Sequence, residues 1–435
     1  MLMRMILTVG LILLFDLYAF QTVRTVTMDM RVSWQKIFRL GFWIISLIMY
    51  TLGILAMAGY FAHTSRTFLV MLTGIFFAMF FAKILMLLPL LLEDVYRVFH
   101  KIVSFFSSIS DKSIDSDKST GYLLSRKKFI SQVSAGIGGL AFGGLTYGVV
   151  KGAHDYKLHK VKVSLKNLPS SFKGLRIGQL SDIHSGSFWD KNAVVKGVEK
   201  LMKEKPDVVF FTGDLVNSIA DEMTDEYIHI FSQVKAPLGV YSVLGNHDYG
   251  DYFNWPDKNQ FQMGNASFGS KKHFSPMQHA NLEKLMHVHK RMGWDLLMNE
   301  NRVLQIGDEK IAVIGVENYG AKGRFAKYGK LSDAYKGVED LPVKILLSHD
   351  PSHWDAQVIQ GYKDIALTLS GHTHGAQFGI ESAAFRWSPI KYMYKQWAGI
   401  YRTGEQYLYV NRGFGYLGYP GRLGIRPEVS IITLS

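Results

Sequence analysis

Four long apolar stretches in the first 150 residues constrain this fold more than any other feature of the sequence. They cover residues 5–23, 41–62, 67–92 and 130–150, and the second and fourth contain no charged side chain. A helix of about 20 apolar residues crosses a hydrocarbon layer ~30 Å thick. The sequence therefore predicts an all-α transmembrane region over residues 1–150, with about four transmembrane helices.

The distribution of Lys and Arg predicts how these helices are oriented. The net charge is +13, and basic residues concentrate between the first two stretches and after the third, whereas Arg66 stands alone between the second and third. Loops rich in Lys and Arg stay in the cytoplasm. We therefore expect a multi-pass protein of the cytoplasmic membrane, in contact with membrane lipids, whose remaining chain is extracytoplasmic. Lys151, Lys157, Lys160 and Lys162 argue the other way, but long domains cross largely regardless of charge.

Two charged residues, Asp16 and Lys83, fall inside apolar stretches. Ionisable groups at such positions usually pair or carry a function. One alternative is that the two side chains pair with each other. The other is that Lys83 extends its ammonium group toward the membrane surface, since both residues lie near the ends of their stretches.

Beyond residue 150 the apolar pattern changes to strands alternating with helices, which indicates a mostly parallel sheet covered by helices. We predict a linker over 151–171 and one domain over 172–435, with two sheets back to back and helices outside. Strands are expected at 160–165, 175–180, 207–211, 240–244, 303–306, 311–316, 343–347, 365–369, 407–410 and 429–434, and helices at 191–204, 221–234 and 282–292. No basic cluster lies beside stacking aromatics, so we expect no nucleic-acid partner.

Polar side chains follow five of these strands at the points where the strands end. They are Asp182 and His184, Asp214, Asn246 and His247, His349, and His372 and His374. Sites in open α/β sheets form where strand ends meet. Cysteine is absent, and carboxylate, amide and imidazole ligands suit Mn, Fe, Zn or Co. The ligands exceed what one ion needs, so we expect two divalent metal ions that share one carboxylate and activate a water molecule.

The order of these motifs resembles the calcineurin-like metallophosphoesterase family: Asp-x-His, Gly-Asp, Gly-Asn-His-Asp, a lone His, and Gly-His-x-His. The resemblance implies a four-layer α/β/β/α sandwich. It assigns Asp182, His184, Asp214 and His374 to one metal ion, and Asp214, Asn246, His349 and His372 to the other. It also implies that His247 donates a proton to the leaving oxygen or stabilises the transition state, and that Asp248 orients His247.

Within that family the chain resembles the membrane-anchored bacterial branch, some of whose members act on phosphodiesters or on the pyrophosphate of UDP-diacylglucosamine. Leu17-Tyr18, the basic run 126–128, and the ending with Arg412-Gly413, Arg422 and Pro427-Glu428 fit this branch. We expect a membrane-anchored phosphoesterase that hydrolyses a phosphodiester or pyrophosphate. The alternative is a non-enzymatic membrane scaffold or sensor with a structural metal site.

Two further features leave alternatives open. Aromatic residues in the loop 252–274 and at Phe385, Trp387, Tyr392, Tyr394 and Trp397 either meet the bilayer, which would favour an amphiphilic, lipid-linked substrate, or belong to the core. Arg412 and Arg422 either hold a phosphate group or fasten the C-terminal loop to Glu428.

Overall fold

The computed structural model describes residues 2–57, 60–61, 64–107, 116–257, 274–323, 325–382 and 384–435. Within these ranges the chain forms two compact units, Met1–Val150 and Lys151–Ser435.

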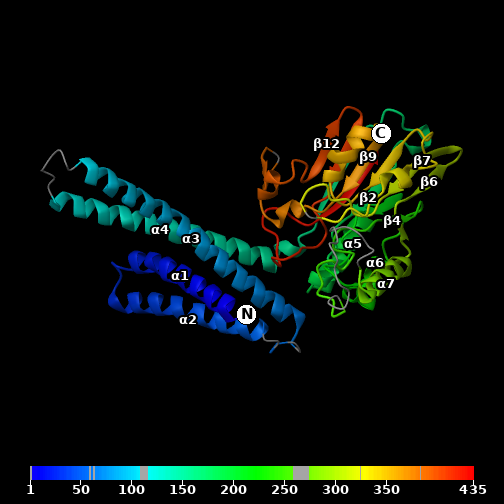
Figure 1. Ribbon diagram of the computed structural model, residues 1–435. Coiled ribbons are helices and arrows are strands. Elements are labelled where there is room, and N and C mark those ends of the chain that lie inside the picture. The colour runs from blue at the N-terminus through cyan, green and yellow to red at the C-terminus, as the bar shows by residue number, and fades with distance from the viewer. Residues whose placement is uncertain are drawn as a thin grey trace. The chain divides into compact units, whose positions relative to one another are not determined.

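The first unit consists of long helices: α1 (Leu2–Val26), α2 (Val32–Met57), α3 (Arg66–Ser107) and α4 (Ser116–Val150). Helices α3 and α4 run antiparallel and side by side, as Figure 1 shows. Three stretches of the described helices are long and apolar enough to cross a membrane, Val32–Ala56, Arg66–Phe105 and Arg126–His154. Helix α1 is not among these three, although we predicted about four transmembrane helices.

A buried polar network joins α1, α2 and α3. The Nζ atom of Lys83 lies 2.7 Å from Oδ1 of Asp16 and 2.7 Å from Oγ of Ser46. The hydroxyl of Tyr50 donates to the other oxygen of Asp16, at 2.7 Å. The side chains of Asp16 and Lys83 are both buried, so of the two alternatives left open by the sequence the structure shows the pairing.

The second unit contains two six-stranded sheets. The first sheet has the order β1 (Lys157–Val163), β14 (Glu428–Leu434), β2 (Arg176–Leu180), β3 (Val208–Phe211), β4 (Val240–Ser242) and β5 (Asp295–Leu296). The second has the order β12 (Gly399–Thr403), β13 (Gln406–Val410), β9 (Ile365–Ser370), β8 (Lys344–Leu347), β7 (Glu309–Gly315) and β6 (Glu300–Ile306). A short ribbon, β10 (Ile380–Glu381) with β11 (Arg386–Trp387), stands apart from both.

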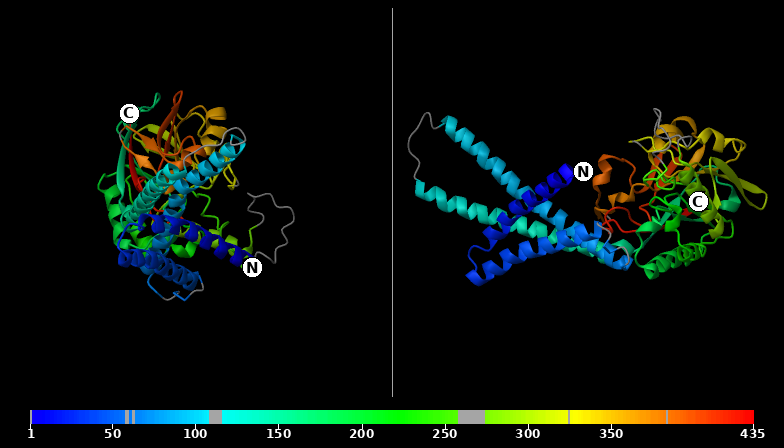
Figure 2. Two further views of the ribbon diagram at one scale, coloured as in Figure 1. Left: turned by 90° about the vertical axis from the view of Figure 1, so that its left-hand side faces the viewer. Right: turned by 60° about the horizontal axis from the view of Figure 1, so that its bottom comes forward.

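Alternation of side chains along the strands builds the layers. In β3, Val208 and Phe210 face the core between the sheets, whereas Val209 and Phe211 pack beneath helices, because successive side chains of a strand point to opposite faces. The first sheet is covered by α5 (Lys191–Met202), α6 (Asp225–Phe231) and α7 (Pro276–Met292). The second is covered by α8 (Leu331–Tyr335) and the helical residues 354–361. These are the four layers α/β/β/α that we predicted; Figure 2 shows the same ribbon from two further sides.

Differences from the predicted elements concern boundaries, short strands, and two short helical segments that had not been predicted, α8 and residues 354–361. The helix expected over 221–234 is only Asp225–Phe231, because Thr224 caps its start by accepting a hydrogen bond from the backbone of Tyr227. The short strands β5, β10, β11 and β12 had not been predicted. Most of the aromatic loop 252–274 lies outside the described residues.

Candidate functional site

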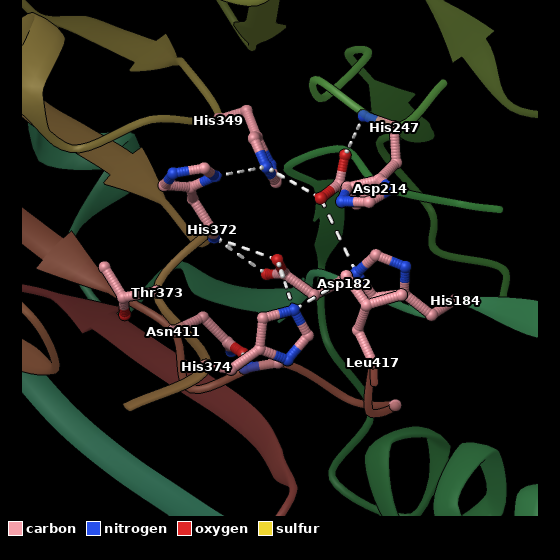
Figure 3. A network of polar contacts seen from close by, with 12 residues as sticks. Asp182, His184, Asp214, His247, His349, His372, Thr373, His374, Asn411 and Leu417 are labelled. Atoms are coloured by element: carbon pink, nitrogen blue, oxygen red, sulfur yellow. Dashed lines mark hydrogen bonds and ion pairs between the residues drawn. The ribbon is translucent and has the colours of Figure 1, made fainter. Parts of the chain in front are cut away.

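The loops after five parallel strands meet at one place in the second unit. Strands β2, β3 and β4 are parallel neighbours in one sheet, and β8 and β9 are parallel neighbours in the other. The carboxyl ends of all five therefore lie at the same edge of the sandwich, and the polar residues that follow them converge there (Figure 3).

Six of the seven predicted ligand residues form two compact groups in which ligand atoms lie within 4.8 Å of one another. One group holds Asp182, His184 and His374, and the other holds Asp214, His349 and His372. The seventh, Asn246, lies in the loop after β4, next to His247, whose backbone amide donates to Oδ1 of Asp214 at 2.9 Å.

One carboxylate oxygen reaches both groups. Oδ2 of Asp214 lies 3.1 Å from Nε2 of His349 and 3.5 Å from Nε2 of His184. The other oxygen of Asp214 is held by the backbone amide of His247, so the carboxylate cannot turn away without losing that bond. Asp214 is therefore placed to bridge the two groups.

Hydrogen bonds behind the histidines fix which ring nitrogen faces the centre. Nδ1 of His349 donates to the backbone oxygen of Thr212 at 2.7 Å, and Nδ1 of His184 lies 3.1 Å from Oδ1 of Asn217. Each of these rings therefore turns Nε2 toward Asp214. Partners of this kind orient metal-binding histidines in general.

Two further observations indicate that these nitrogen and oxygen atoms suit divalent cations. Nε2 of His184 lies 3.1 Å from Nε2 of His374, so two ring nitrogens face each other across the first group. Oδ1 of Asn246 is buried and has no hydrogen-bond partner in the described part of the chain. Leaving a buried polar atom unpaired costs roughly 1–3 kcal/mol. One cation in each group would satisfy these atoms, the two histidines in the first group and Asn246 beside the second.

Backbone strain concentrates at the same residues. Asp182, His184, Asp214, His372 and His374 all have φ between 48° and 71°. Residues other than glycine rarely adopt this left-handed conformation, and it persists mainly at functional sites, where it aims side chains. Of the described non-glycine residues, nine have positive φ, and five of those nine are predicted ligands.

Two glycines allow the carboxylates to approach the neighbouring backbone. A Cβ atom at Gly371 would lie 2.2 Å from Oδ2 of Asp182, and one at Gly245 would lie 2.2 Å from Oδ1 of Asp214. Neither position tolerates a side chain while the carboxylate stays in place.

The electrostatics of the cluster favour positive charge at its centre. Burial raises the pKa of both Asp182 and Asp214, but His374 and His349 reverse this and hold the two pKa values below their usual range. Burial lowers the pKa of His349, yet Asp214 reverses this and raises it to about 10. Burial lowers the pKa of His184, which keeps its imidazole neutral.

His247 lies beside the first ligand group, with its ring centroid 4.9 Å from that of His184, whereas Asp248 occupies different surroundings from those we predicted. Nδ1 of His247 donates to the backbone oxygen of Asn217 at 2.6 Å, and its ring packs against that of Tyr252. The carboxylate of Asp248 does not orient this ring. It accepts hydrogen bonds from the backbone amides of Asp214, Leu215, Val216 and Gly245. Asp248 therefore ties the loop after β3 to the loop after β4.

The two C-terminal arginines are also held by protein groups. Arg412 is buried and pairs with Glu428 at 2.6 Å and with Glu381, so it fastens the C-terminal segment. Arg422 is buried and donates to the backbone oxygens of Gly413 and Gly415 rather than to Glu428. Neither guanidinium is exposed to bind a phosphate group.

Some residues of the site had not been recognised in the sequence. Asn217 contacts both His184 and His247, although its position in a polar loop gave no signal. Tyr394 is buried, and its hydroxyl lies 3.0 Å from Nε2 of His372. It belongs to the aromatic run at 385–397, which the sequence could place only at the bilayer or in the core.

Comparison with known families covers both units. Residues 3–153 match the profile described as "Probable Calcineurin-like phosphoesterase, transmembrane domain", and residues 175–376 match "Calcineurin-like phosphoesterase". The chain belongs to the calcineurin-like metallophosphoesterase family. It is a membrane protein of that family, and its relatives include animal as well as bacterial proteins.

Three relatives illustrate this range. A zebrafish "Transmembrane protein with metallophosphoesterase domain" is 30% identical over 294 residues, which cover 66% of this chain and 59% of the relative. The Bacillus subtilis metallophosphoesterase YkuE is 27% identical, covering 72% of this chain and 98% of its own. The Chlamydia trachomatis UDP-2,3-diacylglucosamine pyrophosphatase LpxG is 27% identical over a match that covers 57% of this chain and 81% of LpxG. The chain thus spans about 59% of the length of the zebrafish protein and of its bovine counterpart.

Proposed function

We propose that this metallophosphoesterase is a membrane-anchored hydrolase that uses two divalent metal ions to cleave a phosphodiester or pyrophosphate. The observation that carries the proposal is the position of Asp214, whose Oδ2 lies within 3.5 Å of a histidine from each group. Asp182, His184, Asp214 and His374 would hold one ion, and Asp214, Asn246, His349 and His372 the other. Mn, Fe, Zn and Co all suit these nitrogen and oxygen donors.

When bound, such a pair of ions activates a water molecule and neutralises the charge of a phosphoryl group. The protein's own contribution is acid–base chemistry at His247. Its Nδ1 proton is engaged by Asn217, and Nε2 has no hydrogen-bond partner among the described residues. A protonated His247 would therefore donate from Nε2 to the oxygen that leaves phosphorus. Nothing in this scheme requires a covalent bond between the protein and the substrate.

The surface beside the site favours an amphiphilic substrate. We call residues 378–382 and 384–400 the rim lobe. Phe385, Tyr392 and Met393 are exposed on it by 55%, 76% and 65% of their surface. The same lobe carries Tyr394, which contacts His372, so this apolar surface adjoins the proposed metal centre. Aromatic side chains next to basic ones settle at the headgroup level of a bilayer.

A substrate panel tests the hydrolase. The full-length protein in detergent would be assayed with phosphomonoesters, phosphodiesters and pyrophosphates, water-soluble and lipid-linked, with added Mn²⁺, Mg²⁺, Zn²⁺ or Co²⁺. We expect metal-dependent turnover that Asp214→Ala abolishes. Asp221→Ala, which removes an exposed carboxylate paired with Lys284, is the matched control and should be fully active. If the wild type turns over no substrate faster than Asp214→Ala does, a non-enzymatic scaffold or sensor becomes the better explanation.

A second assay tests the amphiphilic substrate. We compare kcat/KM for a lipid-linked ester with that for its soluble headgroup, in the wild type and in Phe385→Ser/Tyr392→Ser. Wild type should prefer the lipid-linked ester and the double variant should lose that preference while keeping its rate on the soluble ester. Val303→Ser on β6, at the far edge of the second sheet, is the control. An unchanged preference in the double variant would exclude the rim lobe from substrate binding.

A further inference from the structure

The membrane unit contains a polar cavity of about 250 Å³ between α1, α3 and α4. Its lining includes Tyr18 and Gln21 of α1, Glu93, Asp94 and Arg97 of α3, and Lys127 of α4. The α3 residues fall inside the stretch Arg66–Phe105, which is long and apolar enough to span a membrane, and Lys127 falls inside Arg126–His154. The stretch Arg66–Phe105 has 40 residues, whereas about 20 cross a bilayer, and the charged residues lie at the ends of the apolar stretches 67–92 and 130–150, where charged lipid headgroups are expected.

The acidic groups of this cavity already have partners. Glu93 pairs with Arg126 at 2.7 Å, and Asp94 contacts both Arg97 and the hydroxyl of Tyr18. Lys127 has no ion pair in the described part of the chain. With Arg126 counted, the basic groups at the cavity, Arg97, Arg126 and Lys127, therefore outnumber the acidic groups Glu93 and Asp94 by one.

An apolar groove of about 600 Å³ adjoins the cavity and shares Tyr18 and Asp94 with it. The groove follows α3 past Leu91, Val95, Val98, Phe99 and Ile102. These five side chains are exposed by 48–67% of their surface. Because they recur every three or four residues, they form one continuous stripe along the helix.

We infer that this cavity and groove bind one anionic phospholipid. The phosphate group would lie in the cavity beside Lys127, with Gln21 able to donate a hydrogen bond to its oxygens, and an acyl chain would lie along the stripe of α3. Charge complementarity selects an anionic lipid over a zwitterionic one, whose headgroup would bring its own cation beside Lys127. Basic pockets between transmembrane helices bind anionic headgroups in this way.

The test measures lipid binding to the full-length protein in a neutral detergent. Apparent dissociation constants would be determined by native mass spectrometry for phosphatidylglycerol and phosphatidylcholine with identical acyl chains, and for soluble glycerol phosphate. We expect wild type to prefer phosphatidylglycerol over phosphatidylcholine. Lys127→Gln should weaken phosphatidylglycerol binding about fivefold, the value of one basic residue near an anionic headgroup.

Lys128→Gln is the matched control, since it removes the same charge one residue further along α4, where Lys128 pairs with Asp29 outside the cavity. It should bind phosphatidylglycerol as wild type does. A phosphatidylglycerol affinity that Lys127→Gln leaves unchanged, or no preference between the two lipids in wild type, would overturn the inference. Glycerol phosphate binding as tightly as phosphatidylglycerol would also overturn it, because the acyl groove would then contribute nothing. Hydrolysis of a soluble ester should be the same in wild type and Lys127→Gln, which separates this site from the proposed metal centre.

Discussion

Nδ1 of His247 lies 2.6 Å from the backbone oxygen of Asn217. Because a carbonyl oxygen can only accept a hydrogen bond, Nδ1 carries a proton, and Nε2 is the nitrogen available to a substrate. The side chain of Asn217 contacts His184 of the first ligand group as well. One loop residue thus fixes both a proposed metal ligand and the proposed proton donor.

The first prediction follows from this geometry. His247→Ala should keep both metal ions but lower kcat roughly 10²–10⁴-fold, the usual effect of losing a general acid. The loss should be much smaller for an ester with a very good leaving group, which needs no proton. His229→Ala, on the exposed surface of α6, is the control. Equal losses on good and poor leaving groups would contradict the acid role of His247.

The second prediction concerns the shared carboxylate. Asp214→Ala should reduce the occupancy of both ions, whereas His349→Ala should mainly reduce one, because only Asp214 lies within 3.5 Å of both groups. Elemental analysis of the purified variants gives the metal-to-protein ratio. Two ions retained per chain in Asp214→Ala would show that Asp214 is not the bridge.

The third prediction concerns acid stability. Burial raises the pKa of Glu428, but Arg412 reverses this and lowers it to about 2. A carboxyl with a depressed pKa stabilises the folded state above its unfolded pKa, near 4.5, and this contribution is lost as the pH falls from about 4.5 toward 2. Glu428→Gln should therefore lower Tm strongly at pH 7, and its difference from wild type should shrink at pH 3. Glu405→Gln, which breaks an exposed ion pair, should change Tm little at either pH.

The fourth prediction concerns the buried pair in the membrane unit. Asp16→Asn or Lys83→Met alone leaves one uncompensated group, and breaking a buried pair costs roughly 3–5 kcal/mol. Both single variants should unfold at lower temperature in detergent, and Asp16→Asn/Lys83→Met should recover part of the loss. A double variant whose Tm shift equals the sum of the single shifts would show that the two side chains do not depend on each other.

The fifth prediction concerns the side of the membrane. From the placement of Lys and Arg we propose that the metallophosphoesterase unit is extracytoplasmic. Protease added to intact spheroplasts should then digest the chain beyond about Lys151. Protection of this unit until the cells are lysed would place it in the cytoplasm.

The sequence predicted the sandwich and its polar strand ends because both depend on local patterns. Each block, such as Asp182-x-His184, follows an apolar run of strand length, and parallel strands bring such blocks to one edge. The role of Asn217 could not be predicted, since it depends on how two loops distant in sequence pack together. The left-handed backbone conformation of His374 could not be predicted either, because only the folded surroundings hold a histidine in that conformation. From the family's motif we expected Asp248 to orient the ring of His247. Its carboxylate instead accepts hydrogen bonds from the backbone amides of Asp214 and Gly245.

The position of β14 has a consequence for how the protein is made. This strand lies between β1 and β2, parallel to the first and antiparallel to the second. While the ribosome is still adding the residues before 428, β1 has no neighbour in its sheet, and β2 has one open edge. The first sheet can therefore close only once residues 428–434 have been synthesised, so the second unit cannot fold progressively from its N-terminal end. Loss of these seven residues through a premature stop codon would separate β1, the first strand after α4, from β2, the strand that ends just before Asp182.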